Sequence, residues 1–221
     1  MLQTSEHAVS RRAIGAGFGG IAFGVLTLVA VQVSNAPGGN YSASQVAEYL
    51  ARGHRVGVIV VFHLALLGLL GLISLLAHLR DTLENRRAAS IVWGTGLASA
   101  ACFAVGWGIV GGQVIAHLEG GQAIAISPAT TYLISEIGVV FIFGCGAILL
   151  GFALIILMLS AGTFLPAWLR WLTLACGIGG VAGLAFFTFF VLMFWSIAIG
   201  AWLIATGRRY APTEIAVPAN T

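Results

Sequence analysis

Long apolar runs, separated by short polar segments, divide this chain. Each run approaches the roughly 20 residues that an α-helix needs to cross the hydrocarbon core of a bilayer. The runs are continuously apolar rather than alternating, which argues against the strands of a membrane β-barrel. We therefore expect an all-α polytopic membrane bundle that forms a single domain over residues 1–221. Its six predicted transmembrane helices cover about 13–34, 56–79, 91–117, 130–159, 167–186 and 189–207.

A polar loop, residues 35–55, follows the first span and contains a short predicted helix at 43–52. Ser42 precedes this helix and Gln45 follows three positions later, which is the spacing of a capping box. The helix has one apolar face, formed by Val46, Ala47 and Leu50. Two interpretations stay open: the helix rests on the bilayer or caps the mouth of the bundle, or it is only a spacer.

The last apolar stretch is too long for one span. Between Arg170 and Arg208 lie 37 mostly apolar residues, and one helix of that length would measure about 55 Å at 1.5 Å per residue. The hydrocarbon core is only about 30 Å thick. We therefore divide the stretch into two spans with a turn near Phe187 and Thr188, although no polar turn marks this boundary.

The arginines predict an orientation. With six spans, most of them lie at the chain ends or in the turns near 80–87 and 160–170, all on one side of the membrane; these are Arg11, Arg12, Arg80, Arg86, Arg87, Arg170, Arg208 and Arg209. Only Arg52 and Arg55 fall on the opposite side. The positive-inside rule then places both termini in the cytoplasm and the 43–52 helix outside.

Composition supports a membrane protein and narrows its chemistry. The chain is 59% hydrophobic and 8% charged, against about 25% charged residues in soluble domains. Its net charge of +3 comes from arginines at the span ends and indicates no nucleic-acid partner. The chain has no lysine, which excludes a lysine-linked cofactor. Its three cysteines form no CxxC pair, so neither a disulfide framework nor a thiolate zinc site is indicated.

Two ionisable side chains lie inside predicted spans, His63 in the second and Glu136 in the fourth. A charge at the bilayer centre costs about 2.5–3.5 kcal/mol on insertion scales, so such residues usually face the bundle interior or water. Both lie roughly 8–12 Å from the outer ends of their spans at 1.5 Å per residue, so they could meet. They would then form either a structural clamp or a ligand-binding or proton-switch site, in which the carboxylate holds His63 protonated.

Helical phase predicts that the second and third spans each turn a polar or small stripe inward, at 100° per residue. The first stripe contains His63, Leu67, Leu70, Ser74 and His78, and the second contains Thr95, Ser99, Cys102, Gly106, Gln113 and His117. We therefore predict one outward-opening polar cavity, ringed by Gln32, His63, Gln113, His117, Tyr132 and Glu136. For Gln32, His117 and Tyr132 the competing interpretation is contact with lipid headgroups.

The sequence favours binding or passage of a small or lipophilic molecule at this cavity. One alternative is an accessory or structural subunit whose glycine-rich helices pack against a partner in a homo- or hetero-oligomer. The other is an intramembrane redox or hydrolytic enzyme. Haem would need two histidines facing each other at one depth, and neither HExxH nor GxSxG spacing is present. We therefore expect the lipid bilayer as a partner, and no cofactor, metal or catalytic residue.

Four features carry a resemblance to a known family. They are the Arg-then-Gly-rich first span, the stretch "YSASQVAEYLARG", the stretch "LLAHLRDTLE", and "LPAWLRWLTLACGIGGVAGL" followed by "MFWSIAIGAWLIATG". Together they resemble an uncharacterised bacterial six-span membrane family, domain of unknown function 4386. The resemblance covers most of the chain and implies a multi-pass protein of the bacterial inner membrane. That family has no established activity, so the resemblance implies no functional residue.

Overall fold

Helices account for nearly all of the chain that the computed structural model describes, which is residues 2–34, 42–49, 52–120, 127–162, 164–183 and 188–209. No strand occurs within these ranges, so the predicted all-α class is confirmed. The elements in chain order are α1 (Leu2–Ser34), α2 (Ala43–Tyr49), α3 (Arg52–Thr82), α4 (Arg86–Gly120), α5 (Pro128–Val139), the π-helical segment η2 (Val140–Gly146), α6 (Ala147–Ser160), α7 (Ala167–Val181) and α8 (Phe189–Arg209).

Helices long and apolar enough to cross a membrane coincide with the first, second, third, fourth and sixth predicted spans. They are Ser10–Ser34, Val56–Thr82, Arg86–Ala116, Pro128–Ser160 and Phe189–Gly207. α7 is apolar but has only 15 residues, about 22 Å at 1.5 Å per residue. The predicted fifth span ends at residue 186, and residues 184–187 lie outside the described ranges. The first residue of the predicted turn, Phe187, is therefore not described. α8 begins at Phe189, as predicted.

Local capping determines where two of the helices begin. At α5 the Ser127 side chain accepts a hydrogen bond from the Thr130 backbone N–H at 3.2 Å, and Pro128 occupies the first helical position. At α2 the predicted capping box forms, because the Ser42 backbone N–H donates to Gln45 Oε1 at 2.9 Å. α2 packs against α5 and α3 and buries Val46. α2 is therefore in contact with the helices α3 and α5.

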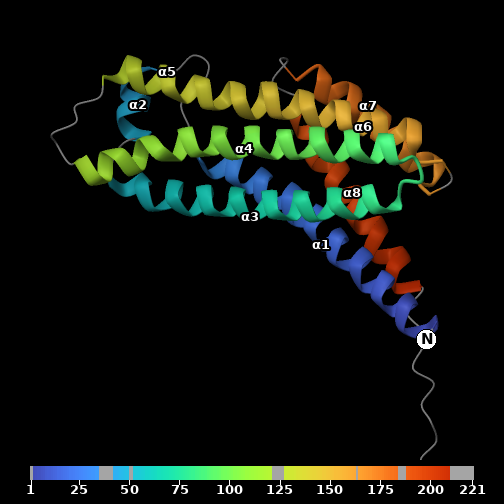
Figure 1. The fold of residues 1–221 in the computed structure, drawn as a ribbon. Helices are drawn as coiled ribbons and strands as arrows, with labels where there is room; N and C mark the ends of the chain where they lie inside the picture. Colours follow the sequence, from blue (N-terminus) through green and yellow to red (C-terminus); the bar gives the residue numbers. More distant parts are fainter. Residues whose placement is uncertain are drawn as a thin grey trace, which may run out of the picture.

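α1 packs closely against α3 on one side and α8 on the other, through the glycines of its apolar half. A Cβ atom at Gly19 would lie 2.6 Å from the Gly71 carbonyl oxygen of α3, and one at Gly20 would lie 2.8 Å from the Ser196 carbonyl oxygen of α8. Glycine is required at such positions because the two backbones are in contact. The other side of the molecule is built from α3, α4 and the α5–α6 rod, with α4 between α3 and α5 (Figure 1).

Aromatic side chains fill the core where α1, α4 and α8 meet. The Phe103 ring packs against Phe23 at a centroid distance of 6.0 Å and against Phe189 at 5.7 Å. All three rings are buried. Further along α8, the indole N–H of the buried Trp195 donates a hydrogen bond to Thr173 Oγ1 of α7 at 2.9 Å. This hydrogen bond joins the short helix α7 to α8.

Of the two stripes predicted to face inward, the one on α4 does so and the one on α3 does not. On α4 the stripe faces other helices, because Ser99 and Gln113 are buried and both hydrogen-bond across to the α5–α6 rod. On α3 the prediction is wrong. Leu67 and Leu70 are 55% and 63% exposed, and His63 and Ser74 are exposed too. The buried face of α3 consists of leucine, alanine and valine instead, among them Val61, Ala65, Leu69, Leu72, Leu76 and Leu79.

Candidate functional site

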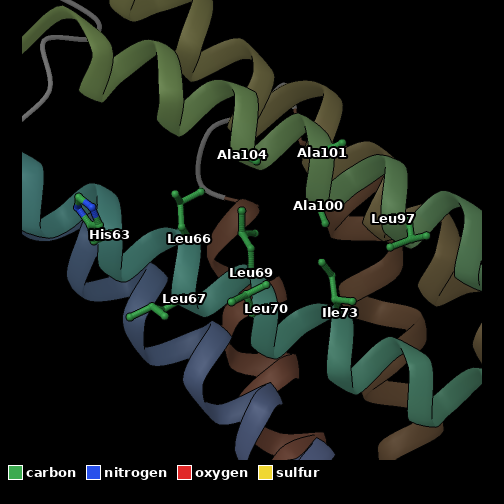
Figure 2. A pocket seen from close by; sticks show the side chains of 10 residues that line it. All are labelled: His63, Leu66, Leu67, Leu69, Leu70, Ile73, Leu97, Ala100, Ala101 and Ala104. Atoms are coloured by element: carbon green, nitrogen blue, oxygen red, sulfur yellow. The ribbon is translucent and has the colours of Figure 1, made fainter. Parts of the chain in front are cut away.

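A groove with a volume of about 590 Å³ lies between α3 and α4. This volume falls within the roughly 300–1,000 Å³ of small-molecule sites. Figure 2 shows His63 near one end of the α3 wall and three alanines on the α4 wall. His63 is the one polar residue among those that line the groove, which are His63, Leu66, Leu67, Leu69, Leu70, Ile73, Leu97, Ala100, Ala101 and Ala104.

Close contacts between α3 side chains and α4 glycines lie beyond both ends of the groove. Toward one end Phe62 of α3 packs against Gly111 of α4, where a Cβ would lie 3.2 Å from the ring. Toward the other end Leu76 of α3 packs against Gly96 of α4. Between these contacts α4 contributes Leu97, Ala100, Ala101 and Ala104 to the lining of the groove.

The His63 ring is fixed by its own helix. Its Nδ1 lies 2.8 Å from the Ile59 carbonyl oxygen, one turn earlier. A carbonyl oxygen can only accept, so Nδ1 carries the proton and donates. In the neutral ring Nε2 is then an acceptor. The Phe62 ring packs edge-on against the imidazole at a centroid distance of 5.6 Å.

His63 lies inside the candidate membrane span of α3 and not at its end. It follows Val56, the first residue of the apolar span, by seven positions, or about 10 Å at 1.5 Å per residue. A polar side chain at this depth normally faces other helices or water. His63 instead borders a groove whose other lining residues are apolar.

The other residues predicted to ring a cavity lie in different places. Gln113 is 6% exposed, and its Nε2 donates to Ser135 Oγ of α5 at 2.9 Å. Tyr132 and Glu136 lie one turn apart on α5 and hydrogen-bond to each other. Gln32 is exposed near the end of α1. His117 belongs to α4, but its side chain lies outside the described part of the structure.

These residues come from different helices. His63 comes from α3 and Glu136 from α5, and α4 runs between those helices (Figure 1). Within the described ranges, no hydrogen bond or ion pair joins the two side chains. The predicted His63–Glu136 pair is therefore not formed in this structure, and His63 belongs to a different cavity. A binding role for each of the six residues stays a prediction.

Sequence reasoning missed two features of this region. Of the three alanines of the groove on α4, Ala100 is buried, Ala104 is half-buried and Ala101 is exposed, and small apolar residues give no chemical signal of a binding site. The fourth span also contains η2, where Ser99 Oγ of α4 donates to the Gly146 carbonyl oxygen at 2.7 Å. Such π-helical turns inside α-helices frequently occur at functional sites, but nothing in the residue types of Val140–Gly146 distinguishes them from an α-helix.

Metal-binding side chains do not cluster in the part of the chain that the structure describes. No three His, Cys, Asp or Glu residues there come close enough together to hold an ion. Comparison with known proteins gives no relative, because no protein-family model, curated protein or solved structure matches the chain.

Proposed function

We propose that this membrane protein binds a lipophilic molecule in the groove between α3 and α4. One observation carries the proposal: a 590 Å³ groove between two membrane-spanning helices has nine apolar lining residues and one histidine. An apolar ligand can enter such a groove from the bilayer without crossing water. The ligand class is the one expected from the sequence, a lipophilic molecule. The binding site is the α3–α4 groove instead of the predicted outward-opening polar cavity.

The polar residue gives the groove a means of selecting its ligand. Apolar walls contact an ordinary acyl chain and an apolar ligand about equally well, because lipid tails are as apolar as leucine. Selectivity in a bilayer must therefore come from shape and from hydrogen bonding. His63 offers a hydrogen-bonding atom at a depth where lipid headgroups do not compete for it.

We also propose the finer topology. α7 forms the fifth of six spans, which places both chain ends in the cytoplasm of a bacterial cell and α2 on the outer side of the inner membrane. The support is the arginine distribution, with Arg80, Arg86 and Arg87 flanking the α3–α4 turn. Cysteine labelling from outside the cell tests the orientation: a cysteine introduced at Ser44 is expected to react, and one introduced at Asp81 is not.

Copurification tests the binding function. The protein is extracted with its surrounding lipid into polymer nanodiscs, and the extracted lipids are compared by mass spectrometry with those of the bulk membrane. Ala101→Phe fills the groove with a ring, whereas Ala98→Phe adds the same ring at an exposed position of α4 outside the groove. We expect one lipophilic species to be enriched with the wild type and with Ala98→Phe, and lost with Ala101→Phe. Equal lipid content in all three proteins would contradict the proposal.

A further inference from the structure

We infer that the ligand of the α3–α4 groove is a lipophilic alcohol whose hydroxyl group donates a hydrogen bond to Nε2 of His63. This inference rests on the proposed function and specifies the chemistry of its ligand. Three observations carry it: the direction of the His63–Ile59 hydrogen bond, the apolar lining of the rest of the groove, and the position of His63 seven residues after the start of the candidate span.

The first step is the direction of the hydrogen bond. The Ile59 carbonyl oxygen, 2.8 Å from Nδ1, accepts a proton that the imidazole must supply. When the imidazole carries a single proton, that proton is on Nδ1, so Nε2 has only a lone pair to offer. Within the described part of the chain, no other hydrogen bond to this ring is formed. A ligand group that satisfies Nε2 must therefore be a donor.

The second step is the nature of that donor. An ammonium group is a donor but carries a charge, a carboxylate carries a charge and has no proton to give, and a phosphate carries a charge in either of its ionised forms. A charge at the membrane interior is costly. A hydroxyl group supplies a donor without charge and has few other polar atoms to desolvate. The hydroxyl is thus the smallest neutral group that matches an acceptor lying about 10 Å inside the span.

The third step concerns the remainder of the ligand. From His63 to Ile73 the groove follows α3 for ten residues, about 15 Å at 1.5 Å per residue. Its other lining residues are leucine, isoleucine and alanine, and they offer no second polar contact. The body of the ligand is therefore an apolar chain or a slender apolar skeleton that lies along α3, with the hydroxyl at the His63 end (Figure 2).

Competition between an alcohol and its methyl ether tests this inference, because the ether keeps the chain and the oxygen but lacks the donor proton. The protein in nanodiscs of defined lipid is labelled with tetradecanol that carries a diazirine near its methyl end, and the labelled peptides are mapped. 1-Tetradecanol and 1-methoxytetradecane then compete with the probe. Each competitor is dosed as a measured mole fraction of the membrane lipid, so that a difference in partitioning does not enter the comparison.

The wild type should prefer the alcohol to the ether by about threefold to tenfold, which is the usual net value of one hydrogen bond. His63→Phe keeps a flat ring but removes the acceptor, and it should abolish the preference while the apolar groove still takes up the probe. His78→Phe makes the same change on the same helix outside the groove, and it should keep the wild-type preference.

Two results would overturn the inference. One of them would contradict only the hydroxyl assignment, and the other would also contradict the proposed function. If labelling maps to the groove and is blocked by Ala101→Phe, but the ether competes as well as the alcohol, the hydroxyl assignment is wrong and the binding function stands. If labelling maps elsewhere and Ala101→Phe does not change it, the proposed function fails as well. The wild-type comparison of alcohol with ether decides the hydroxyl assignment even if His63→Phe does not accumulate.

Discussion

Gly71→Ala should destabilise the bundle, because this glycine lies where α3 touches α1 backbone to backbone. An added Cβ would come into contact with the Gly19 carbonyl oxygen and would lie 3.1 Å from the Gly19 Cα. Neither atom belongs to a flexible side chain, so the two helices must separate. Moving a carbon from such a contact to an ordinary one of about 3.5–4.0 Å requires a shift on the order of 1 Å.

The expected cost follows from comparison with a glycine that has free space. Gly108→Ala lies within α4, where a Cβ would meet nothing within 4 Å. Both substitutions stiffen the unfolded backbone and favour the helix to a similar extent, so these effects cancel in the difference between them. What remains is the overpacking, typically about 1–3 kcal/mol. Gly71→Ala should therefore be less stable than Gly108→Ala by about that amount.

The measurement is reversible unfolding of the purified protein in mixed micelles, with increasing SDS, followed by circular dichroism. The difference in free energy of unfolding between Gly71→Ala and Gly108→Ala is the quantity of interest. If the two variants agree within about 0.3 kcal/mol, which is the usual scatter between independent sites, the close approach of α1 and α3 at Gly19 and Gly71 is wrong. The proposed helix arrangement would then need revision.

Three further predictions concern buried and groove hydrogen bonds. Thr173→Val should leave the Trp195 indole N–H without its partner and lower the free energy of unfolding by about 1–3 kcal/mol, measured by the same SDS titration; an unchanged stability would contradict that bond. Ser135→Ala alone should cost more stability than the double variant Ser135→Ala with Gln113→Leu, because the double variant leaves no buried amide N–H unpaired; a double variant less stable than the single one would refute this. Nitrogen-15 NMR of histidine-labelled protein, assigned by loss of the signal in His63→Phe, should show a His63 ring protonated at Nδ1 and not at Nε2; a ring protonated at Nε2 would remove the basis for the alcohol.

Span positions and helix starts could be predicted because they depend on local sequence. Apolar run length located five helices that are long and apolar enough to cross a membrane, and the capping residues Ser42 and Ser127 lie where their spacing indicated. The short helix α7 could not be predicted in this way. Its apolar run continues toward α8, so composition alone does not show that the described helix stops at Val181.

The orientation of α3 could not be predicted, because apolar residues on a membrane helix face lipid and neighbouring helices alike. The inward stripe of α4 was correct since Ser99 and Gln113 find partners on the α5–α6 rod. On α3 the same reasoning depended on His63, whose ring bonds to its own backbone and needs no neighbouring helix. Leu67 and Leu70 lie on the same face of α3 as His63 and are exposed with it.

The hydrogen bond from His63 to Ile59 explains how the imidazole is tolerated but gives little reason for its presence. Ile59 lies inside α3, so its carbonyl oxygen already accepts the backbone N–H one turn later. The imidazole adds a second bond to an acceptor that is already satisfied, and a leucine at the same position would leave no buried group unpaired. Apart from its own backbone bond, the ring contacts Phe62 of the same helix, and a polar side chain inside a candidate membrane span is costly, so an occupant of the groove explains His63 better than the fold does.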